Sequence, residues 1–332
     1  MWAKALSGMP KVDPVTWQSL DWFARWLIAT RAAVLVMTFT SAALAGLFAY
    51  KAGQFDFTLW LFVTLGLCLA HATNNLLNDL TDHVKGVDKG NYFRTQYGVQ
   101  PIESGLMSVS QNLWYTAVTG GLALLCGVYL WWLRGDAVIS LTAIGAFFVL
   151  FYTWPLKYIG LGEPAVLLVW GPLMIGGGYY VISGDINLPV VLAATTYALA
   201  PTAVLFGKHI DKLQADADKG IRTLPVILGH ERSRRWVMGL FIAQYPLILL
   251  LVVMGYFHPV VLLTGLAIPS LFRIKTFFKD PAPTSAEDAP EEFRKVWPLY
   301  YVAAAFWYTR RFGGIFTATL IVDAFLMADA ST

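Results

Sequence analysis

This sequence contains few charged residues and very little cysteine. Asp, Glu, Lys and Arg make up 14% of its 332 residues, whereas a soluble globular domain carries about 25%. The two cysteines, Cys68 and Cys126, both lie in apolar stretches, so we expect small buried side chains there and neither a disulfide nor a metal pair. The net charge of +3 is too small to indicate a nucleic acid as a partner.

Hydrophobic residues, in contrast, account for 57% of the chain, and aromatic residues, including 13 Trp, for 15%. This composition is typical of a multi-pass membrane protein whose Trp and Tyr side chains lie at the membrane interfaces. Nine apolar stretches are long enough to be helical spans, although the eighth is short. They cover approximately residues 31–50, 56–77, 111–133, 136–154, 163–182, 189–207, 236–256, 258–272 and 311–328. The sequence therefore predicts an all-α membrane protein whose partner is the lipid bilayer.

Lysine and arginine are unevenly distributed among the predicted loops. The N-terminal segment and the loops after spans 2, 4, 6 and 8 hold 20 of the 24 basic residues, in groups of four, three, one, seven and five. The loops between spans 5 and 6 and between spans 7 and 8 hold none. Because basic loops face the cytoplasm, we place the N-terminal segment and the even-numbered loops on that side.

The most informative polar residues lie at the end of the second apolar stretch. Asn75, Asn78, Asp79 and Asp82 recur at i, i+3, i+4 and i+7, which puts two amides and two carboxylates on one face of a helix. Acidic side chains at the edge of a membrane span are costly and usually functional. Oxygen ligands on one face suit Mg²⁺, which takes phosphate oxygens as further partners. An ordinary solvated helix end is the alternative, and four polar groups in register argue against it.

A second polar stretch follows the sixth span and contains Asp211, Asp216 and Asp218. Since both stretches follow even-numbered spans, we expect both at the same membrane interface. Basic residues bracket them, namely Lys85, Lys89, Arg94, Lys212, Lys219 and Arg222. Metal ions on the carboxylates, with the remaining phosphate charge on Arg and Lys, would hold a diphosphate that carries a long apolar tail. A basic loop that touches anionic lipid headgroups would explain the cations but not the aspartates.

At these two stretches the sequence resembles the UbiA superfamily of intramembrane prenyltransferases. Residues 75–88 resemble the Asn-Asp-x-x-Asp signature, and within them residues 79–88 are similar to the form found in the branch that prenylates 1,4-dihydroxy-2-naphthoate in menaquinone synthesis. Residues 211–229 resemble the second Asp-rich motif of the family and the Gly-x-Arg-Thr-Leu-Pro segment after it. Two further matches cover residues 100–108 and 152–173. The four matches occur in the family's order and together extend from span 2 to span 7.

The resemblance implies one membrane domain over residues 1–332, with about nine helices around a central cavity and with residues 1–25 and 280–295 on the cytoplasmic side. It implies Mg²⁺-dependent transfer of a polyprenyl group from its diphosphate to an aromatic acceptor, with 1,4-dihydroxy-2-naphthoate as the candidate. The implied catalytic residues are Asp79, Asp82, Asp211 and Asp216. The implied metal ligands are these four aspartates and Asn78. The implied substrate-binding residues are Asn75, Lys85, Arg94, Lys157, Arg222, Tyr152 and Tyr158.

The second motif departs from the family pattern, which begins with Asn and spaces its aspartates as Asp-x-x-x-Asp. Here Lys208 and His209 occupy the Asn region, and the interval from Asp211 to Asp216 is one residue longer. Asp216 keeps the family's distance from Gly220, four residues later. These features favour a helix that ends before Asp216. They rank the aspartates in the order Asp211, Asp216 and Asp218.

Several assignments have alternatives. Arg31 either reaches the headgroup site or extends to the membrane surface, and His71 either lines the cavity or makes a core hydrogen bond. Tyr152 and Tyr158 either stabilise a carbocation through their π faces or belong to an interfacial aromatic belt. For the whole chain, a UbiA-type terpene cyclase that needs no acceptor is the alternative enzyme. A lipid-binding or transport protein is the alternative outside enzymes.

Overall fold

The structure is a computed structural model that describes residues 1–87, 99–295 and 297–329, without the side chains of residues 292, 328 and 329. Its described part contains helices and no strands, which confirms the all-α prediction. The chain divides into two compact units, which are described separately below. The first comprises residues 1–42 and 61–156, and the second comprises residues 43–60 and 157–332. The prediction of one domain over the whole chain stays a prediction.

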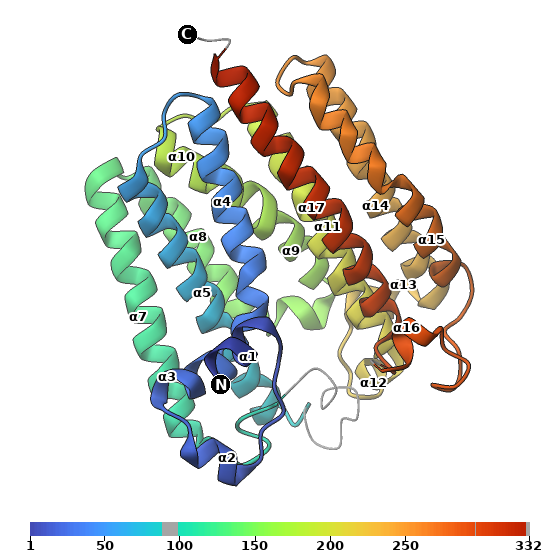
Figure 1. The fold of residues 1–332 in the computed structure, drawn as a ribbon. Coiled ribbons are helices and arrows are strands. Elements are labelled where there is room, and N and C mark those ends of the chain that lie inside the picture. The colour runs from blue at the N-terminus through green and yellow to red at the C-terminus, as the bar shows by residue number, and fades with distance from the viewer. Residues whose placement is uncertain (88–98, 296, 330–332) are drawn as a thin grey trace. The chain divides into compact units, whose positions relative to one another are not determined.

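The first unit contains the N-terminal helices and most of the first predicted spans (Figure 1). Two helices, α4 and α5, extend from this unit into residues of the second. The elements are α1 (Trp2–Ser7), α2 (Pro14–Ser19), α3 (Trp22–Ala29), η1 (Ala32–Val34), α4 (Leu35–Lys51), α5 (Phe57–Val84), α7 (Val109–Arg134) and α8 (Ala137–Phe151). A short 3₁₀ helix, η2 (Leu156–Ile159), leads into the second unit.

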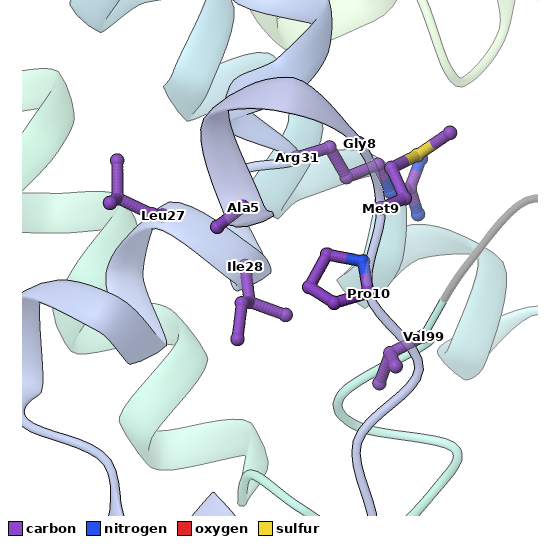
Figure 2. A pocket seen from close by; sticks show the side chains of 8 residues that line it. All are labelled: Ala5, Gly8, Met9, Pro10, Leu27, Ile28, Arg31 and Val99. Atoms are coloured by element: carbon purple, nitrogen blue, oxygen red, sulfur yellow. The ribbon is translucent and has the colours of Figure 1, made fainter. Parts of the chain in front are cut away.

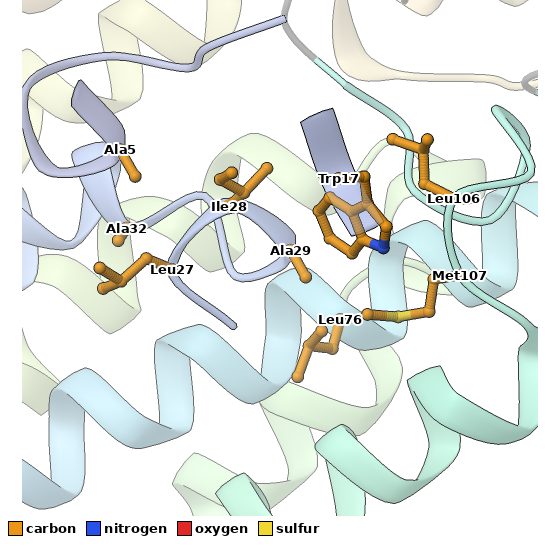
Figure 3. Packing of buried hydrophobic residues seen from close by; sticks show 9 residues of the cluster. All are labelled: Ala5, Trp17, Leu27, Ile28, Ala29, Ala32, Leu76, Leu106 and Met107. Atoms are coloured by element: carbon orange, nitrogen blue, oxygen red, sulfur yellow. The ribbon is translucent and has the colours of Figure 1, made fainter. Parts of the chain in front are cut away.

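A buried apolar cluster holds the N-terminal helices to the first unit (Figure 3). Trp17 from α2 and Leu27 and Ile28 from α3 pack in the same cluster as Leu76 from α5. The cluster is completed by Ala5, Ala29, Ala32, Leu106 and Met107. Burial of such apolar surface is the main favourable term in packing outside the bilayer. The packing of this cluster holds residues 1–32 close to the start of the first polar motif at Asn75.

The second unit contains the remaining helices. They are α9 (Gly162–Leu168), a π-helical segment η3 (Val169–Gly176), α10 (Gly177–Ser183), α11 (Leu188–Asp211), α12 (Leu213–Asp218), α13 (Leu224–Leu228), α14 (His230–Val253), η4 (Pro259–Ala267), α15 (Ile268–Lys279), α16 (Glu291–Arg294) and α17 (Tyr300–Asp329). Helix α11 packs against α14 and α17. A Cβ atom at Gly207 would lie 2.8 Å from the carbonyl oxygen of Tyr301, so only glycine permits this close approach of α11 and α17.

Seven helical segments of the described residues are long and apolar enough to cross a membrane. They are Ala32–Lys51, Phe57–Val84, Val109–Arg134, Gly162–Ser183, Leu188–Asp211, His230–Val253 and Pro259–Lys279. The helix Ala137–Phe151 is apolar but shorter. The predicted count of nine spans is therefore not confirmed, although each predicted span coincides with a helical segment.

The last helix differs from its prediction. We expected a final span over approximately residues 311–328, but α17 is continuous from Tyr300 to Asp329. Arg311 lies within this helix, and its guanidinium is 4.1 Å from the centre of the Trp307 ring. Contact of a cation with an aromatic face lowers the cost of placing charge on an apolar helix.

Candidate functional site

The first acidic motif lies on the last turns of α5, as the spacing predicts. All four of its polar side chains are buried, with exposed fractions of 8% for Asn75 and Asn78, 2% for Asp79 and 0% for Asp82. The Asn75 amide donates to the carbonyl oxygen of Thr30 at 2.7 Å. Buried polar groups require such partners, so this motif is part of the packed interior and is not a solvated helix end.

Arg31 connects three parts of the first unit. Its guanidinium donates to Asn78 Oδ1 at 3.2 Å and to Gln100 Oε1 at 3.0 Å. It also lies 3.7 Å from Asp79 Oδ1, and the backbone N–H of Ile102 donates to the other oxygen of Asp79 at 3.3 Å. Of the two alternatives for Arg31, the structure therefore favours the one that brings it to the motif.

The backbone of Arg31 is strained. With φ 54° and ψ 52°, Arg31 is the one residue other than glycine, among those described, that has a positive φ. This left-handed conformation is unfavourable for a side chain with a Cβ atom, and it separates α3 from α4. Strained residues of this kind cluster at functional sites, and the guanidinium of this residue contacts the acidic motif.

A small cavity of about 10 Å³ adjoins Arg31 (Figure 2). It is lined by Ala5, Gly8, Met9, Pro10, Leu27, Ile28, Arg31 and Val99. Figure 2 shows the Arg31 side chain on the side of the cavity that Gly8 and Met9 line. This volume is about that of one water molecule. The cavity is therefore too small for a prenyl chain or an aromatic acceptor.

Other predicted residues of the first unit have defined positions. The Lys85 ammonium lies 4.5 Å from the centre of the Trp154 ring, and the Asn78 amide donates to Thr153 Oγ1 at 3.3 Å. Tyr152 is half-buried. His71 pairs with Thr38 at 2.7 Å, which supports its alternative as a core hydrogen-bonding residue. Arg94 lies outside the described residues.

In the second unit, the helix that carries the second motif ends at Asp211, as the spacing predicts. Lys212 has φ −115° and ψ 20° and separates α11 from α12. The Asp211 carboxylate accepts hydrogen bonds from the backbone N–H groups of Tyr301 at 2.8 Å and Val302 at 3.0 Å. These groups belong to the first turn of α17, where N–H groups have no partner within the helix. Asp211 therefore caps the last helix.

Asp216 and Asp218 have different environments. Asp216 is 1% exposed, and its Oδ1 atom accepts from the Lys212 ammonium at 2.8 Å. Asp218 is exposed and accepts from the Gln214 amide at 2.7 Å. The structure thus buries the aspartate that we ranked second and exposes the one that we ranked third. The metal-ligand roles of Asp211 and Asp216 stay predictions.

The remaining predicted residues of the second unit are dispersed. Lys157 is buried, and its ammonium lies 5.6 Å from the ring centre of Tyr158, which is half-buried. Arg222 is exposed. These positions are compatible with substrate binding but do not test it.

A buried pair next to the second motif was not predicted from the sequence. His209 Nδ1 lies 2.5 Å from Glu163 Oε1, and both side chains are at most 2% exposed. The second Glu163 oxygen accepts from the Leu224 N–H at 3.4 Å. The sequence indicates that such residues need a buried partner, because an ionisable side chain in an apolar stretch requires one, but it does not identify that partner.

Comparisons with known proteins identify relatives that match more than half of the chain. The sequence model of the UbiA prenyltransferase family matches residues 39–299. The 1,4-dihydroxy-2-naphthoate octaprenyltransferase of Escherichia coli is 28% identical over 228 residues, which are 67% of this chain and 74% of the relative. The UbiA prenyltransferase domain-containing protein 1 of Danio rerio is 24% identical over 84% of this chain and 83% of its own length. The digeranylgeranylglyceryl phosphate synthase of Natronomonas pharaonis is 28% identical over 62% of this chain and 71% of its own.

Two solved structures share the fold. A digeranylgeranylglyceryl phosphate synthase superposes with a TM-score of 0.61 and 16% identity, covering 91% of this chain and 98% of the other. A UbiA homologue from Archaeoglobus fulgidus, bound to GPP and Mg²⁺, superposes with a TM-score of 0.54 and 14% identity, covering 85% and 99%. At these identities the likeness concerns the fold alone.

Proposed function

The chain belongs to the UbiA prenyltransferase family, and we propose that it transfers a polyprenyl group from its diphosphate to an aromatic acceptor within the membrane. The observation that carries this proposal is the buried motif on α5, with Asp79 and Asp82 at 2% and 0% exposure at the end of an apolar helix. Carboxylates in such a place are retained for a function. The similarity to naphthoate octaprenyltransferases from two bacteria makes 1,4-dihydroxy-2-naphthoate the first acceptor to test.

The first motif fits a magnesium ion. Mg²⁺ is usually held by one or two carboxylates together with substrate phosphates and waters, and Asp79, Asp82 and the Asn78 amide provide such a partial set. In the described residues no three His, Cys, Asp or Glu side chains are grouped as metal ligands, so substrate oxygens would complete the shell. When bound, the ion would neutralise charge on the departing diphosphate. The fold neighbour from Archaeoglobus fulgidus, which holds GPP and Mg²⁺, supports this part of the proposal.

The protein groups have defined tasks in this reaction. The bond between the allylic carbon and the diphosphate oxygen breaks, and its electron pair leaves with the diphosphate. Cationic side chains stabilise that charge, and we assign this task to Lys85, Lys157, Arg222 and Arg94. Tyr152 and Tyr158 offer π faces to the carbocation. A ring carbon of the acceptor then forms the new bond and releases one proton, while apolar walls exclude water.

The proposal assigns both acidic motifs to one diphosphate. Both follow even-numbered predicted spans and so belong to one membrane side, which the distribution of Lys and Arg identifies as the cytoplasmic side. Asn75 is assigned to the same headgroup.

The proposal is tested with purified protein in lipid nanodiscs. Isoprenyl diphosphates of several chain lengths are incubated with a panel of aromatic acceptors, and prenylated products are identified by mass spectrometry. We expect product only with Mg²⁺, loss of product with EDTA and recovery when Mg²⁺ is restored. Products formed without an acceptor would identify a cyclase instead. Absence of diphosphate release under every condition would indicate a binding or transport protein.

A further inference from the structure

The second motif of this chain contains a lysine at an unexpected position. The family pattern Asp-x-x-x-Asp, counted back from Asp216, places its first aspartate at residue 212, where this chain has Lys212. Asp211, the neighbouring acidic residue, is shifted by one position. The motif thus carries a fixed positive charge where the resemblance implies a carboxylate.

Lys212 is buried together with Asp216. The side chains of Lys212 and Asp216 are 2% and 1% exposed, and Lys212 Nζ lies 2.8 Å from Oδ1 of Asp216, four residues along the chain. Glu163 interacts electrostatically with both of them, and its own carboxylate meets His209. A buried ammonium is costly unless it is paired and hydrogen-bonded. Lys212 and Asp216 therefore form a buried ion pair that is part of the folded structure at this end of α11.

The other acidic side chains of the motif are committed to protein groups. Asp211 accepts two backbone N–H groups of α17, and the exposed Asp218 accepts from Gln214. In contrast, Asp216 Oδ2 is buried and accepts no hydrogen bond from any described residue. The motif thus presents a single buried carboxylate, and an ammonium already neutralises it.

This charge balance opposes a divalent cation at Asp216, because one ammonium neutralises the one buried carboxylate. At the first motif, in contrast, the single Arg31 guanidinium accompanies two buried carboxylates, Asp79 and Asp82. A metal ion at Asp216 would lie a few ångströms from the Lys212 ammonium, and repulsion is strong where water is excluded. An ammonium is itself a strong donor to phosphate oxygens. Given the proposed function, we infer that Lys212 supplies at the second motif the positive charge that a metal ion would otherwise supply. The enzyme then uses one divalent ion, at the first motif.

The metal count tests this inference without turnover. Mn²⁺ replaces Mg²⁺, inorganic diphosphate is the anion, and bound Mn²⁺ is counted from the electron paramagnetic resonance signal of the free ion. We expect one Mn²⁺ per wild-type chain, none for Asp82→Asn and still one for Asp216→Asn. Two ions on the wild-type chain, or the loss of an ion in Asp216→Asn, would overturn the inference.

A second experiment uses the reverse substitution at position 212. Lys212→Asp restores the family spacing with Asp216, so we expect the count to rise from one to two Mn²⁺ per chain. The variant is purified with Mn²⁺ present, because it would otherwise bury two carboxylates side by side. A count that stays at one in the folded variant, as judged by gel filtration and circular dichroism, contradicts the inference.

A third experiment measures how much the Lys212 ammonium contributes to the affinity for diphosphate. Lys212→Gln combined with Asp216→Asn removes both charges and keeps a neutral hydrogen-bonded pair, so the fold is preserved. We expect its affinity for diphosphate, measured by calorimetry at saturating Mn²⁺, to fall about tenfold, which is about 1.4 kcal/mol. Lys212→Arg keeps the charge and should retain most of the affinity for diphosphate. Asp218→Asn, at an exposed position, is the matched control. An unchanged affinity in the double variant would refute the inference.

Failure of the proposed function is distinguishable from failure of this inference. The function fails if no prenyl diphosphate reacts, or if diphosphate with Mn²⁺ does not bind the wild-type chain. The inference alone fails if diphosphate binds with two ions while prenyl transfer proceeds.

Discussion

The Lys51 ammonium lies 2.6 Å from Asp323 Oδ2, although 272 positions separate the two residues. Both side chains are buried, with exposed fractions of 8% and 1%. Lys51 also donates to the carbonyl oxygen of Tyr256 and lies 4.4 Å from the centre of that ring. The other Asp323 oxygen accepts from the His258 N–H at 2.6 Å. Within the second unit, these contacts join the end of α4 and the loop after α14 to α17.

The first prediction follows from this pair. Asp323→Ala leaves an ammonium buried without its counter-charge and should lower the free energy of unfolding by about 3–5 kcal/mol. Lys51→Met combined with Asp323→Asn removes both charges and keeps an acceptor for His258, so it should cost much less. Thermal unfolding in detergent measures both variants. Equal losses in the single and double variants would show that charge pairing is not what stabilises this region.

The second prediction concerns the first motif. Asp79→Asn and Asp82→Asn should each reduce prenyl transfer more than tenfold, which raises the barrier by more than about 1.4 kcal/mol, because each removes a headgroup charge. Both should remain folded, since Asn keeps the volume and one acceptor. The matched control is Glu103→Gln, whose partly exposed side chain pairs with His83 at 2.8 Å. If either aspartate variant keeps more than a tenth of the activity, the assignment is wrong.

The third prediction concerns Arg31. Lysine keeps the charge, but its compact ammonium does not reproduce the planar fork whose two nitrogens donate separately to Asn78 and Gln100. Arg31→Lys should therefore lower kcat about tenfold and leave the unfolding temperature nearly unchanged. Steady-state kinetics with saturating prenyl diphosphate measure this effect. A loss of thermal stability that matches the loss of kcat would instead assign Arg31 to the fold.

The fourth prediction concerns Asp211. Asp211→Ala removes the acceptor for two N–H groups in the first turn of α17, and loss of a cap costs about 1–2 kcal/mol. We expect a lower unfolding temperature and unchanged Mn²⁺ binding in the presence of diphosphate. Asp218→Ala, seven residues later and exposed, should change neither quantity.

The fifth prediction concerns sidedness. In a chain without Cys68 and Cys126, single cysteines at the exposed positions 84, 231 and 185 are labelled with an impermeant maleimide in vesicles of both orientations. Val84→Cys and Glu231→Cys should react from the cytoplasmic side and Asp185→Cys from the opposite side. If Val84→Cys and Glu231→Cys react from different sides, the two acidic motifs cannot bind the same diphosphate.

Apolar length and spacing predicted much of the fold. The motif Asn75 to Asp82 lies on a helix because polar residues at helical spacing directly continue an apolar span. The early end of α11 followed from Gly220 and the irregular aspartate spacing. The start of α17 was missed, since Arg310 and Arg311 resemble a loop in sequence, whereas in the structure their guanidinium groups lie over the rings of Phe306 and Trp307.

Roles that depend on distant partners could not be read from the sequence. Asp211 ranked first because it lies close to the end of a predicted span, yet its partners are the N–H groups of Tyr301 and Val302, 90 and 91 residues away. Glu163 and His209 are separated by 46 residues and gave no local signal of their pairing. Hydropathy and periodicity predict the face of a helix on which a residue lies. They do not predict which distant residue it contacts, because that depends on the tertiary structure.

The capping of α17 by Asp211 has a consequence for chimeras between family members. The last helix is not an independent cassette, because two N–H groups of its first turn are satisfied by a side chain at the end of α11. A graft of residues 300–329 into a relative should fold only if the recipient offers an acidic side chain at the corresponding position. Conversely, a screen that scores only activity would record Asp211 as catalytic whenever its replacement loosens this helix.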